Sequence, residues 1–145
     1  IALPIMVVGF MPWLVGYLVM EIVLGFVVAI VFQLAHVVEE TEFEYAGPNE
    51  ALLIENEWAV HQIKTTSNFA PRNKIVSWFA GGLNYQVEHH LFPRISHIHY
   101  PAISKIVEAK CKEYKLPYNS IRTMRAAIVS HFRMMKQMGQ PPQTA

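Results

Sequence analysis

The chain has 145 residues, which is enough for one compact domain and too few for two of ordinary size. Hydrophobic residues make up 52% and charged residues 16% of it, whereas roughly 25% of an average soluble domain is charged. This composition excludes a disordered chain, and the uneven spread of the apolar residues argues against a soluble domain. The single cysteine, Cys111, excludes an internal disulfide and suits a reducing compartment.

The charges divide at Glu57. Up to this residue the chain has eight Glu and no Lys or Arg, and after it twelve Lys and Arg face three Glu. The basic residues are scattered without an Arg-rich run, so we expect no nucleic-acid partner. Lys and Arg beside an apolar segment are typical of the cytoplasmic side of a membrane protein. We therefore expect the second half of the chain to be cytosolic.

An apolar run over residues 13–35 predicts a membrane-spanning helix. A bilayer core of about 30 Å needs roughly 20 helical residues, and Glu21 is the only charged residue before His36. The run is too long for a signal peptide and has no basic start. We expect the helix over residues 13–37, and residues 1–12 to hold the end of a preceding transmembrane helix and a turn. The predicted helix ends at the cytoplasmic surface, so we expect His36 to lie there.

The residues after this helix predict a helical cap over residues 38–138 and a disordered tail over residues 139–145. Acidic residues and a Gly-Pro-Asn turn signal predict a surface loop over residues 39–57. Residues 73–90 resume an apolar pattern that two glycines interrupt. Helices are expected at residues 58–69, 102–114 and about 120–138.

Periodicity within the last two helices predicts the side chains that pack inward. For residues 102–114 the predicted face is Ile103, Ile106, Val107, Lys110 and Tyr114. For residues 120–138 the predicted face is Met124, Ala127, Ile128, His131, Met135 and Met138. On this face we expect His131 to be a hydrogen-bonded core residue.

Histidines are the candidate metal ligands. Gln86, His89 and His90 stand on one face at i, i+3 and i+4 if their segment is helical. Adjacent imidazoles on a helix diverge by about 100°, so each can face a different metal. Neutral imidazole suits iron, zinc, copper and nickel, which leaves the metal open. A pair of surface histidines beside a turn is the alternative. The seven histidines are His36, His61, His89, His90, His97, His99 and His131.

Other metal-site patterns do not occur. The chain has no His-Glu-x-x-His, no cysteine pair and no Glu-x-x-His of the ferritin-like di-iron bundles. It also lacks a phosphate-binding glycine loop and a Gly-x-Ser-x-Gly elbow. Any metal site here is therefore rich in imidazole and poor in carboxylate.

The segment Gln86-Val-Glu-His89-His90-Leu-Phe-Pro93 resembles the third histidine box of membrane fatty acid desaturases. It is similar to the front-end and linoleoyl-CoA desaturase-like branch, in which Gln begins the box. The flanking stretches Trp78-Phe-Ala-Gly-Gly-Leu-Asn-Tyr and Ile95-Ser-His-Ile-His-Tyr-Pro resemble that branch as well. So do Gln33-Leu-Ala-His and Thr65-Thr-Ser-Asn, and the resemblance covers residues 3–138.

This resemblance implies an all-α integral membrane protein. The chain would hold the last transmembrane helix and the cytosolic helical cap of a di-iron desaturase fold, as the C-terminal part of a longer enzyme. The family's first two boxes, H-x(3,4)-H and H-x(2,3)-H-H, do not occur in this sequence. We therefore expect these 145 residues to be inactive alone.

The resemblance also implies roles for single residues. His89 and His90 correspond to iron-binding histidines of the box, and His36 to a histidine at the cytoplasmic end of the last membrane helix that binds one iron. Gln86 would be a weak or water-mediated ligand. His61 would line the acyl channel, orient a ligand or make an ordinary polar contact. The residues expected to hydrogen-bond to the metal-binding side chains, without binding the metal themselves, are Glu88, Glu39, Glu40, His61 and His97.

The implied activity is the insertion of a double bond into a fatty acyl chain, using O2 and two iron ions. Electrons would come from cytochrome b5 or ferredoxin, and the basic half of the chain would offer an acidic donor a docking surface. The implied location is the bacterial inner membrane or the endoplasmic reticulum, with the site on the cytosolic face. Two alternatives stay open: a lipid hydroxylase on the same scaffold, and a non-enzymatic membrane-bound metal or lipid binder.

Overall fold

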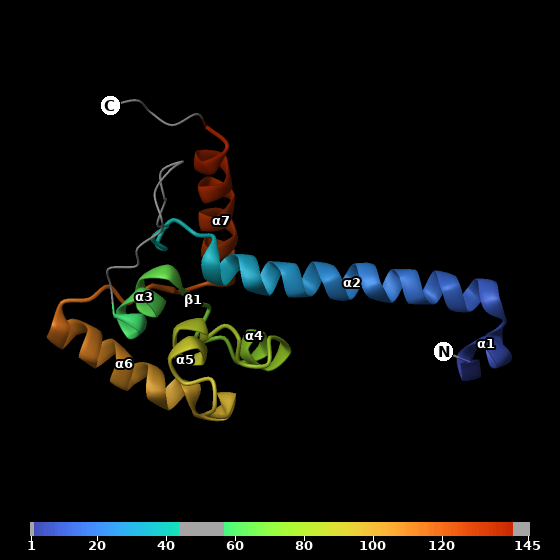
Figure 1. Cartoon of the computed structure of the whole chain (residues 1–145), viewed down its shortest axis with the longest axis horizontal. Coiled ribbons are helices and arrows are strands. Elements are labelled where there is room, and N and C mark those ends of the chain that lie inside the picture. The colour runs from blue at the N-terminus through green and yellow to red at the C-terminus, as the bar shows by residue number, and fades with distance from the viewer. Residues whose placement is uncertain (1, 44–56, 141–145) are drawn as a thin grey trace. The chain divides into compact units, whose positions relative to one another are not determined.

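The computed structural model describes residues 2–43 and 57–140. The regular secondary structure of these residues is almost entirely helical, which confirms the all-α prediction, and their only strands form one short sheet (Figure 1). Most of the expected acidic loop and the last five residues of the expected tail lie outside the described residues. The elements are α1 Ala2–Val8, α2 Phe10–His36, α3 Trp58–Thr65, β1 Asn68–Phe69, α4 Lys74–Phe79, α5 Gln86–Leu91, η1 His97–His99, α6 Tyr100–Tyr114, β2 Ser120–Ile121 and α7 Met124–Met138.

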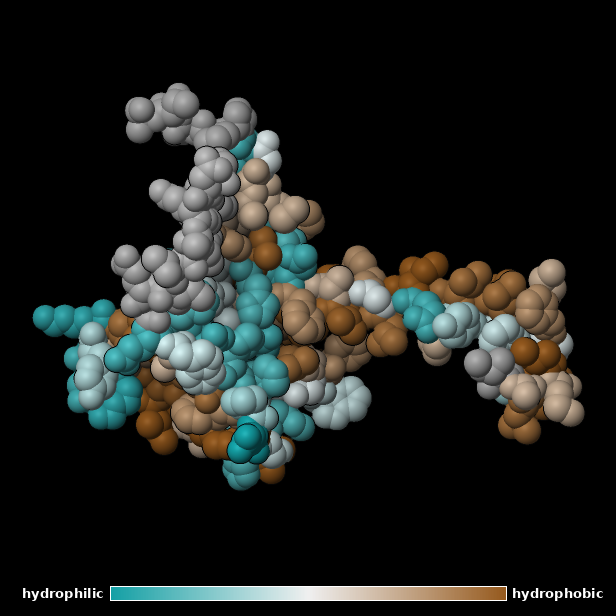
Figure 2. Space-filling view, in the orientation of Figure 1, coloured by the Kyte–Doolittle hydropathy of each residue, from teal (hydrophilic) through white to brown (hydrophobic). Residues whose placement is uncertain are grey.

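The chain divides into two compact units, Ile1–Phe32 and Gln33–Ala145. The first contains α1 and most of α2. Among the described residues, α2 alone is long and apolar enough to cross a membrane, and Figure 2 shows hydrophobic side chains along its surface. Gly9, with a φ of 82°, separates α1 from α2, so the turn is shorter than the one expected. That α1 ends a preceding transmembrane helix stays a prediction.

The second unit is built around α5. This helix packs against both α3 and α6 (Figure 1). Ile63 from α3, Val87 from α5, and Val107 and Cys111 from α6 form a common buried cluster. Burying an aliphatic side chain of this size stabilises a fold by about 1.5–3 kcal/mol. The apolar cluster therefore sets the position of α5.

Two expected helix boundaries were wrong because a small parallel sheet takes the residues concerned. Asn68 pairs with Ser120, and Phe69 pairs with Ile121. The helix expected over residues 58–69 ends at Thr65, since the extended backbone after it hydrogen-bonds to β2 and its surroundings. The helix expected from about Ser120 begins at Met124 instead, after Ser120 and Ile121 have joined the sheet.

The expected packing face of α6 was partly wrong. Ile106 and Tyr114 are exposed, whereas Val107 and Cys111 are buried. Ile103, Val107 and Cys111 follow one another at intervals of four residues, so they share the face that meets the core. The sequence pattern of α6 fits two overlapping faces, and contact with α5 selects one of them.

The packing face of α7 is also rotated about the helix axis from the expected one. Ala127 and Ser130 are its buried residues, while Ile128, Met135 and Met138 are exposed. His131 is half-buried, and its Nδ1 lies 2.8 Å from the carbonyl oxygen of Val37. The hydrogen bond expected for His131 is therefore present, at the edge of the core.

Gly82 permits a close approach between the loop after α4 and η1. Its φ is +79°, and a Cβ atom there would lie 2.5 Å from Cβ of His97. Gly81 also has a positive φ, +57°, but nothing lies within 4 Å of the corresponding position. Both glycines therefore have a positive φ that favours glycine, and only at Gly82 would a side chain also clash with a neighbour.

We predict that Gly82→Ala destabilises the protein more than Gly81→Ala does. Both variants carry the cost of a left-handed backbone, about 1–2 kcal/mol. Gly82→Ala adds overpacking against His97, which costs about 1–3 kcal/mol more. Urea unfolding of the two purified variants measures the difference. Equal losses of stability would show that His97 moves aside freely.

Candidate functional site

The histidine-bearing helix α5 is held in place by an asparagine from β1. A helix of six residues is not stable on its own. The side-chain oxygen of Asn68 accepts a hydrogen bond from the backbone N–H of Val87, at 2.9 Å. Its Nδ2 donates to Oε2 of Glu88 at 2.8 Å. One buried side chain of the sheet therefore fixes both the backbone and the carboxylate of α5.

The carboxylate of Glu88 is fully buried beneath the histidines. Its other oxygen, Oε1, accepts a hydrogen bond from the hydroxyl of Tyr118 at 2.7 Å. Burial raises the pKa of Glu88, while its hydrogen bonds with Tyr118 and Asn68 act in the opposite direction. Both of its partners are non-histidine residues, so Glu88 supports the box through the position of α5 and not by touching an imidazole.

The structure brings three of the predicted ligand histidines together. The ring centroids of His36 and His90 are 5.1 Å apart, and those of His89 and His90 are 5.8 Å apart. Gln86 lies beside them, with its Nε2 atom 3.3 Å from Nε2 of His36. Its Oε1 atom is buried and has no hydrogen-bond partner in the described part of the chain. This oxygen is therefore available to a ligand.

Each histidine of the box has a neutral partner on its Nδ1 atom. Nδ1 of His90 lies 2.7 Å from Oε1 of Gln62 in α3. An amide oxygen only accepts, so the Nδ1 atom of His90 carries the proton and Nε2 carries the lone pair. Nδ1 of His89 lies 3.2 Å from the hydroxyl of Tyr100. Sequence spacing does not predict Gln62 and Tyr100 as partners of the box, because both reach it from other elements.

Burial keeps the His90 ring neutral. It lowers the pKa of His90 to about 4, together with the smaller effect of the nearby His36 and His89, which repel a positive charge. The His90 ring is therefore uncharged at neutral pH. A neutral imidazole with a free lone pair is the form that binds a transition metal.

The donor set fits part of a metal site. Three imidazoles and the oxygen of Gln86 are ligands that iron and similar metals accept. Within residues 2–43 and 57–140, however, no group of three or more His, Cys, Asp or Glu side chains is arranged so that it could hold a metal ion. The described residues therefore do not form a metal site by themselves, and the chemistry of their donors fits a metal that accepts nitrogen ligands.

The other candidate residues lie elsewhere. Glu39 is 3.7 Å from Arg133, and Glu40 accepts a hydrogen bond from Ser130, so both face α7. His97 packs against Gly82. In the described structure no hydrogen bond or ring contact joins Glu39, Glu40 or His97 to the three imidazoles. Glu39 is close to His36 in sequence but faces α7, because the chain turns directly after α2, and its support of the ligands stays a prediction.

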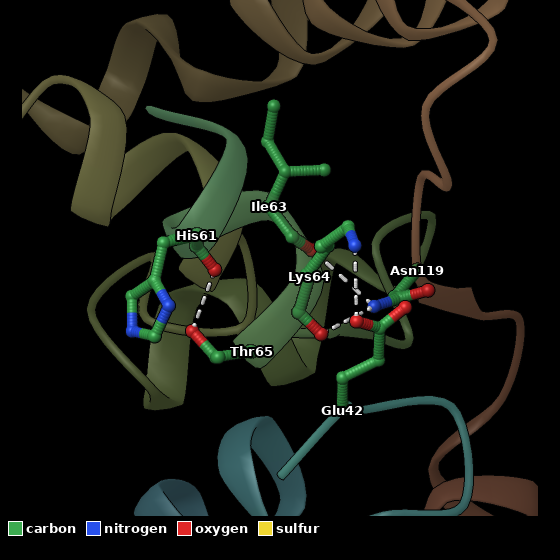
Figure 3. Close-up of polar contacts among 6 residues, drawn as sticks. All are labelled: Glu42, His61, Ile63, Lys64, Thr65 and Asn119. Carbon is green, nitrogen blue, oxygen red and sulfur yellow. Dashed lines mark hydrogen bonds and ion pairs between the residues drawn. The ribbon is translucent and has the colours of Figure 1, made fainter. Parts of the chain in front are cut away.

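The end of α3 is anchored by Asn119 (Figure 3). Its Nδ2 atom donates to the carbonyl oxygens of Ile63, Lys64 and Thr66 at 3.1–3.3 Å. His61, one residue before Gln62, has its carbonyl oxygen bonded by the hydroxyl of Thr65 at 2.9 Å. These bonds satisfy carbonyls that a helix end leaves free, and they hold the helix that carries Gln62.

We predict that Glu88→Gln lowers the free energy of unfolding by about 1–3 kcal/mol, the cost of a buried polar group without its proper partner. The new amino group would face the donors Asn68 and Tyr118. Glu108→Gln on α6 is the matched control, because its carboxylate pairs only with the exposed Lys112 and is worth about 0–1 kcal/mol. Urea unfolding compares the two. Equal losses of stability in the two variants would show that the Glu88 carboxylate does not hold α5 in place.

Known proteins resemble this chain over most of its length. Residues 1–122 match the family model for fatty acid desaturases. The sn-1 linoleoyl-lipid 6-desaturase of Synechocystis sp. is 47% identical over 126 residues, which is 87% of this chain and 35% of that protein. The enzyme of the same name from Arthrospira platensis is 43% identical, over 92% of this chain and 38% of that protein.

A moss protein, the acyl-lipid (8-3)-desaturase of Physcomitrium patens, is 41% identical over 85% of this chain and 25% of its own length. The chain thus spans a quarter to about two fifths of the curated relatives it matches. No solved structure matches it. The matched residues include α2, the histidine box and the sheet that supports the box, and the chain belongs to the fatty acid desaturase family.

Proposed function

We propose that this chain supplies the third histidine box of a fatty acid desaturase, an oxidoreductase that uses O2 to introduce a double bond into a fatty acyl chain. The observation that carries the proposal is the approach of His36 to both His90 and Gln86, with His89 beside His90, in a chain of this family. These residues come from α2 and α5, and 49 positions of sequence separate the two helices.

The proposed cofactor is a non-haem centre of two iron ions. His36, His89 and His90 would bind them, and Oε1 of Gln86 would be a weak or water-mediated ligand. The irons would supply the oxidising power that an unactivated C–H bond requires. Three imidazoles are too few for two irons, so the remaining ligands would come from the family's other two histidine boxes, which do not occur in this sequence.

Gln62 and Tyr100 have the task of orienting the ligands. By accepting the Nδ1 proton of His90, Gln62 turns Nε2 of that ring toward the metal. The hydroxyl of Tyr100, 3.2 Å from Nδ1 of His89, would likewise fix the orientation of that ring. The low pKa of His90 keeps the ring free of a competing proton. Buried hydrogen bonds of this kind restrict the rings before the metal arrives.

The proposed substrate is a fatty acyl group carried by a membrane lipid. The relatives named above are described as acting on linoleoyl-lipid and acyl-lipid groups. Residues 13–37 would span the membrane, and residues 38–138 would form a cap on the cytosolic face, where the Lys and Arg residues are concentrated. An acidic electron donor, cytochrome b5 or ferredoxin, would dock on this basic cap.

We predict that His89→Ala and His90→Ala each abolish unsaturated product in the full-length gene product and reduce its iron content. Loss of one imidazole changes both the geometry and the redox potential of an iron. His99→Ala is the matched control, because that side chain is exposed on η1. Mass spectrometry measures the product, and metal analysis measures the iron. Normal iron and normal product in both variants would refute the proposed site.

We predict that Gln62→Leu weakens iron binding about 10–100-fold, the usual effect of losing a partner of a metal-bound histidine. Gln62→Glu should retain most of the affinity, because its carboxylate still accepts the proton of His90. Gln137→Leu, at an exposed position of α7, is the control. Competition with a chelator measures the affinities. If Gln62→Leu binds iron as tightly as the control does, Gln62 does not orient His90.

A further inference from the structure

The short helix α4 exposes three large apolar side chains. Ile75, Trp78 and Phe79 are 78%, 82% and 65% exposed, and no side chain in the described part of the chain covers them. Their positions, i, i+3 and i+4, put them on one face of the helix. A contiguous apolar patch of this kind marks an interaction surface.

The orientation of this face is fixed by hydrogen bonds on the other side of α4. The side chain of Asn73 accepts from the backbone N–H groups of Ile75 and Val76, at 3.0 and 3.2 Å, and thereby caps the helix. Ser77 points inward, and its hydroxyl accepts a hydrogen bond from the buried Asn84 at 3.0 Å. The exposed face of α4 is therefore a property of the fold.

Positive charges border the apolar face. Ile75 lines a shallow depression of about 500 Å³ together with Arg72, Lys74 and Arg122. The same three cations and Lys105 also line a larger cavity of about 950 Å³. None of the four cations forms an ion pair with a described residue, although several other cations of the cap do so.

One carboxylate, that of Glu108, lies in the larger cavity, and it is bound by Lys112 at 2.9 Å. Within the described part of the chain, the four cations of the cavity thus have no counter-charge at ion-pair distance. Their charge complements an external anion. Ile75 belongs to the apolar face and also lines the depression that holds the cations. A partner bound there would therefore contact both the apolar side chains and the positive charges.

We propose that α4 and its flanking cations bind the surface of a bilayer that contains anionic lipids. Trp and Phe favour the boundary between headgroups and acyl chains, and Arg and Lys bind the phosphates beside it. An acidic protein would satisfy the cations but not three exposed apolar side chains. This membrane contact is independent of metal binding and of the proposed function, since it involves neither the box nor a substrate.

A spin label tests the contact. Ile75→Cys is labelled with a nitroxide in the full-length gene product, which is reconstituted into vesicles of phosphatidylcholine and phosphatidylglycerol; protein without the new cysteine gives the labelling background. Ala109→Cys, at an exposed position of α6, is the water-facing control. We expect the label at position 75 to collide more with oxygen, which concentrates in lipid, than with a water-soluble nickel complex. We expect the reverse at position 109.

Two other outcomes would overturn the proposal. Preference for the nickel complex at position 75 would place α4 in water. Protection from both reagents would mean that protein, such as another part of the enzyme, covers α4. Either result would leave the desaturase proposal intact, because neither concerns the histidines.

Removing charge tests the electrostatic part. In the labelled protein, Arg72→Gln with Arg122→Gln should lower the oxygen preference at position 75, as should vesicles of phosphatidylcholine alone. Arg94→Gln with Arg125→Gln is the matched control, since it removes the same charge from exposed positions that line neither depression. An equal loss in the control pair, or no dependence on the anionic lipid, would contradict a role for these cations.

Discussion

Both oxygens of Glu88 are removed from water, and Asn68 and Tyr118 supply the hydrogen bonds that replace it. A buried carboxylate without such partners costs several kcal/mol, so the three side chains must assemble together. Asn68 belongs to β1, and Tyr118 lies two residues before β2. Each strand of the sheet is only two residues long, and the two strands are held together by their own pairing. The hydrogen bonds of Asn68 and Tyr118 to Glu88 fix the sheet to α5.

Tyr118 and Asn119, the two residues before β2, connect α5, which carries the box histidines, with α3, which carries Gln62. Tyr118 binds the carboxylate beneath α5, which carries His89 and His90. Its neighbour Asn119 holds the end of α3, which carries Gln62, and its carbonyl oxygen accepts from the backbone N–H of Asn68. A displacement of this segment would shift the imidazoles and their hydrogen-bond partner together. The geometry between Gln62 and His90 is thus protected from distortions that affect the segment as a whole.

Sequence periodicity predicted what depends on local pattern. The apolar run predicted α2, and the box spacing placed Gln86 beside His89 and His90 on a short helix. The strands were missed, because two-residue strands have no periodicity and exist only through pairing over about 50 positions of sequence. Gln62 and Tyr100 were missed for the same reason: a partner that another element brings to a histidine has no fixed spacing from it. Glu39 is the converse case: it is close to His36 in sequence, but its described ion pair is with Arg133 of α7.

The partners of the two box histidines differ from the carboxylate–histidine pairs common at metal sites. Gln62 and Tyr100 are neutral, and the buried carboxylate of the same helix, that of Glu88, is hydrogen-bonded to Asn68 and Tyr118. A carboxylate on Nδ1 would stabilise a protonated imidazole and raise its pKa. A neutral amide fixes the same tautomer without that effect, and burial then lowers the pKa of His90 to about 4. The fold in this way holds His90 as an oriented, uncharged imidazole, which is the form that the proposed metal site requires.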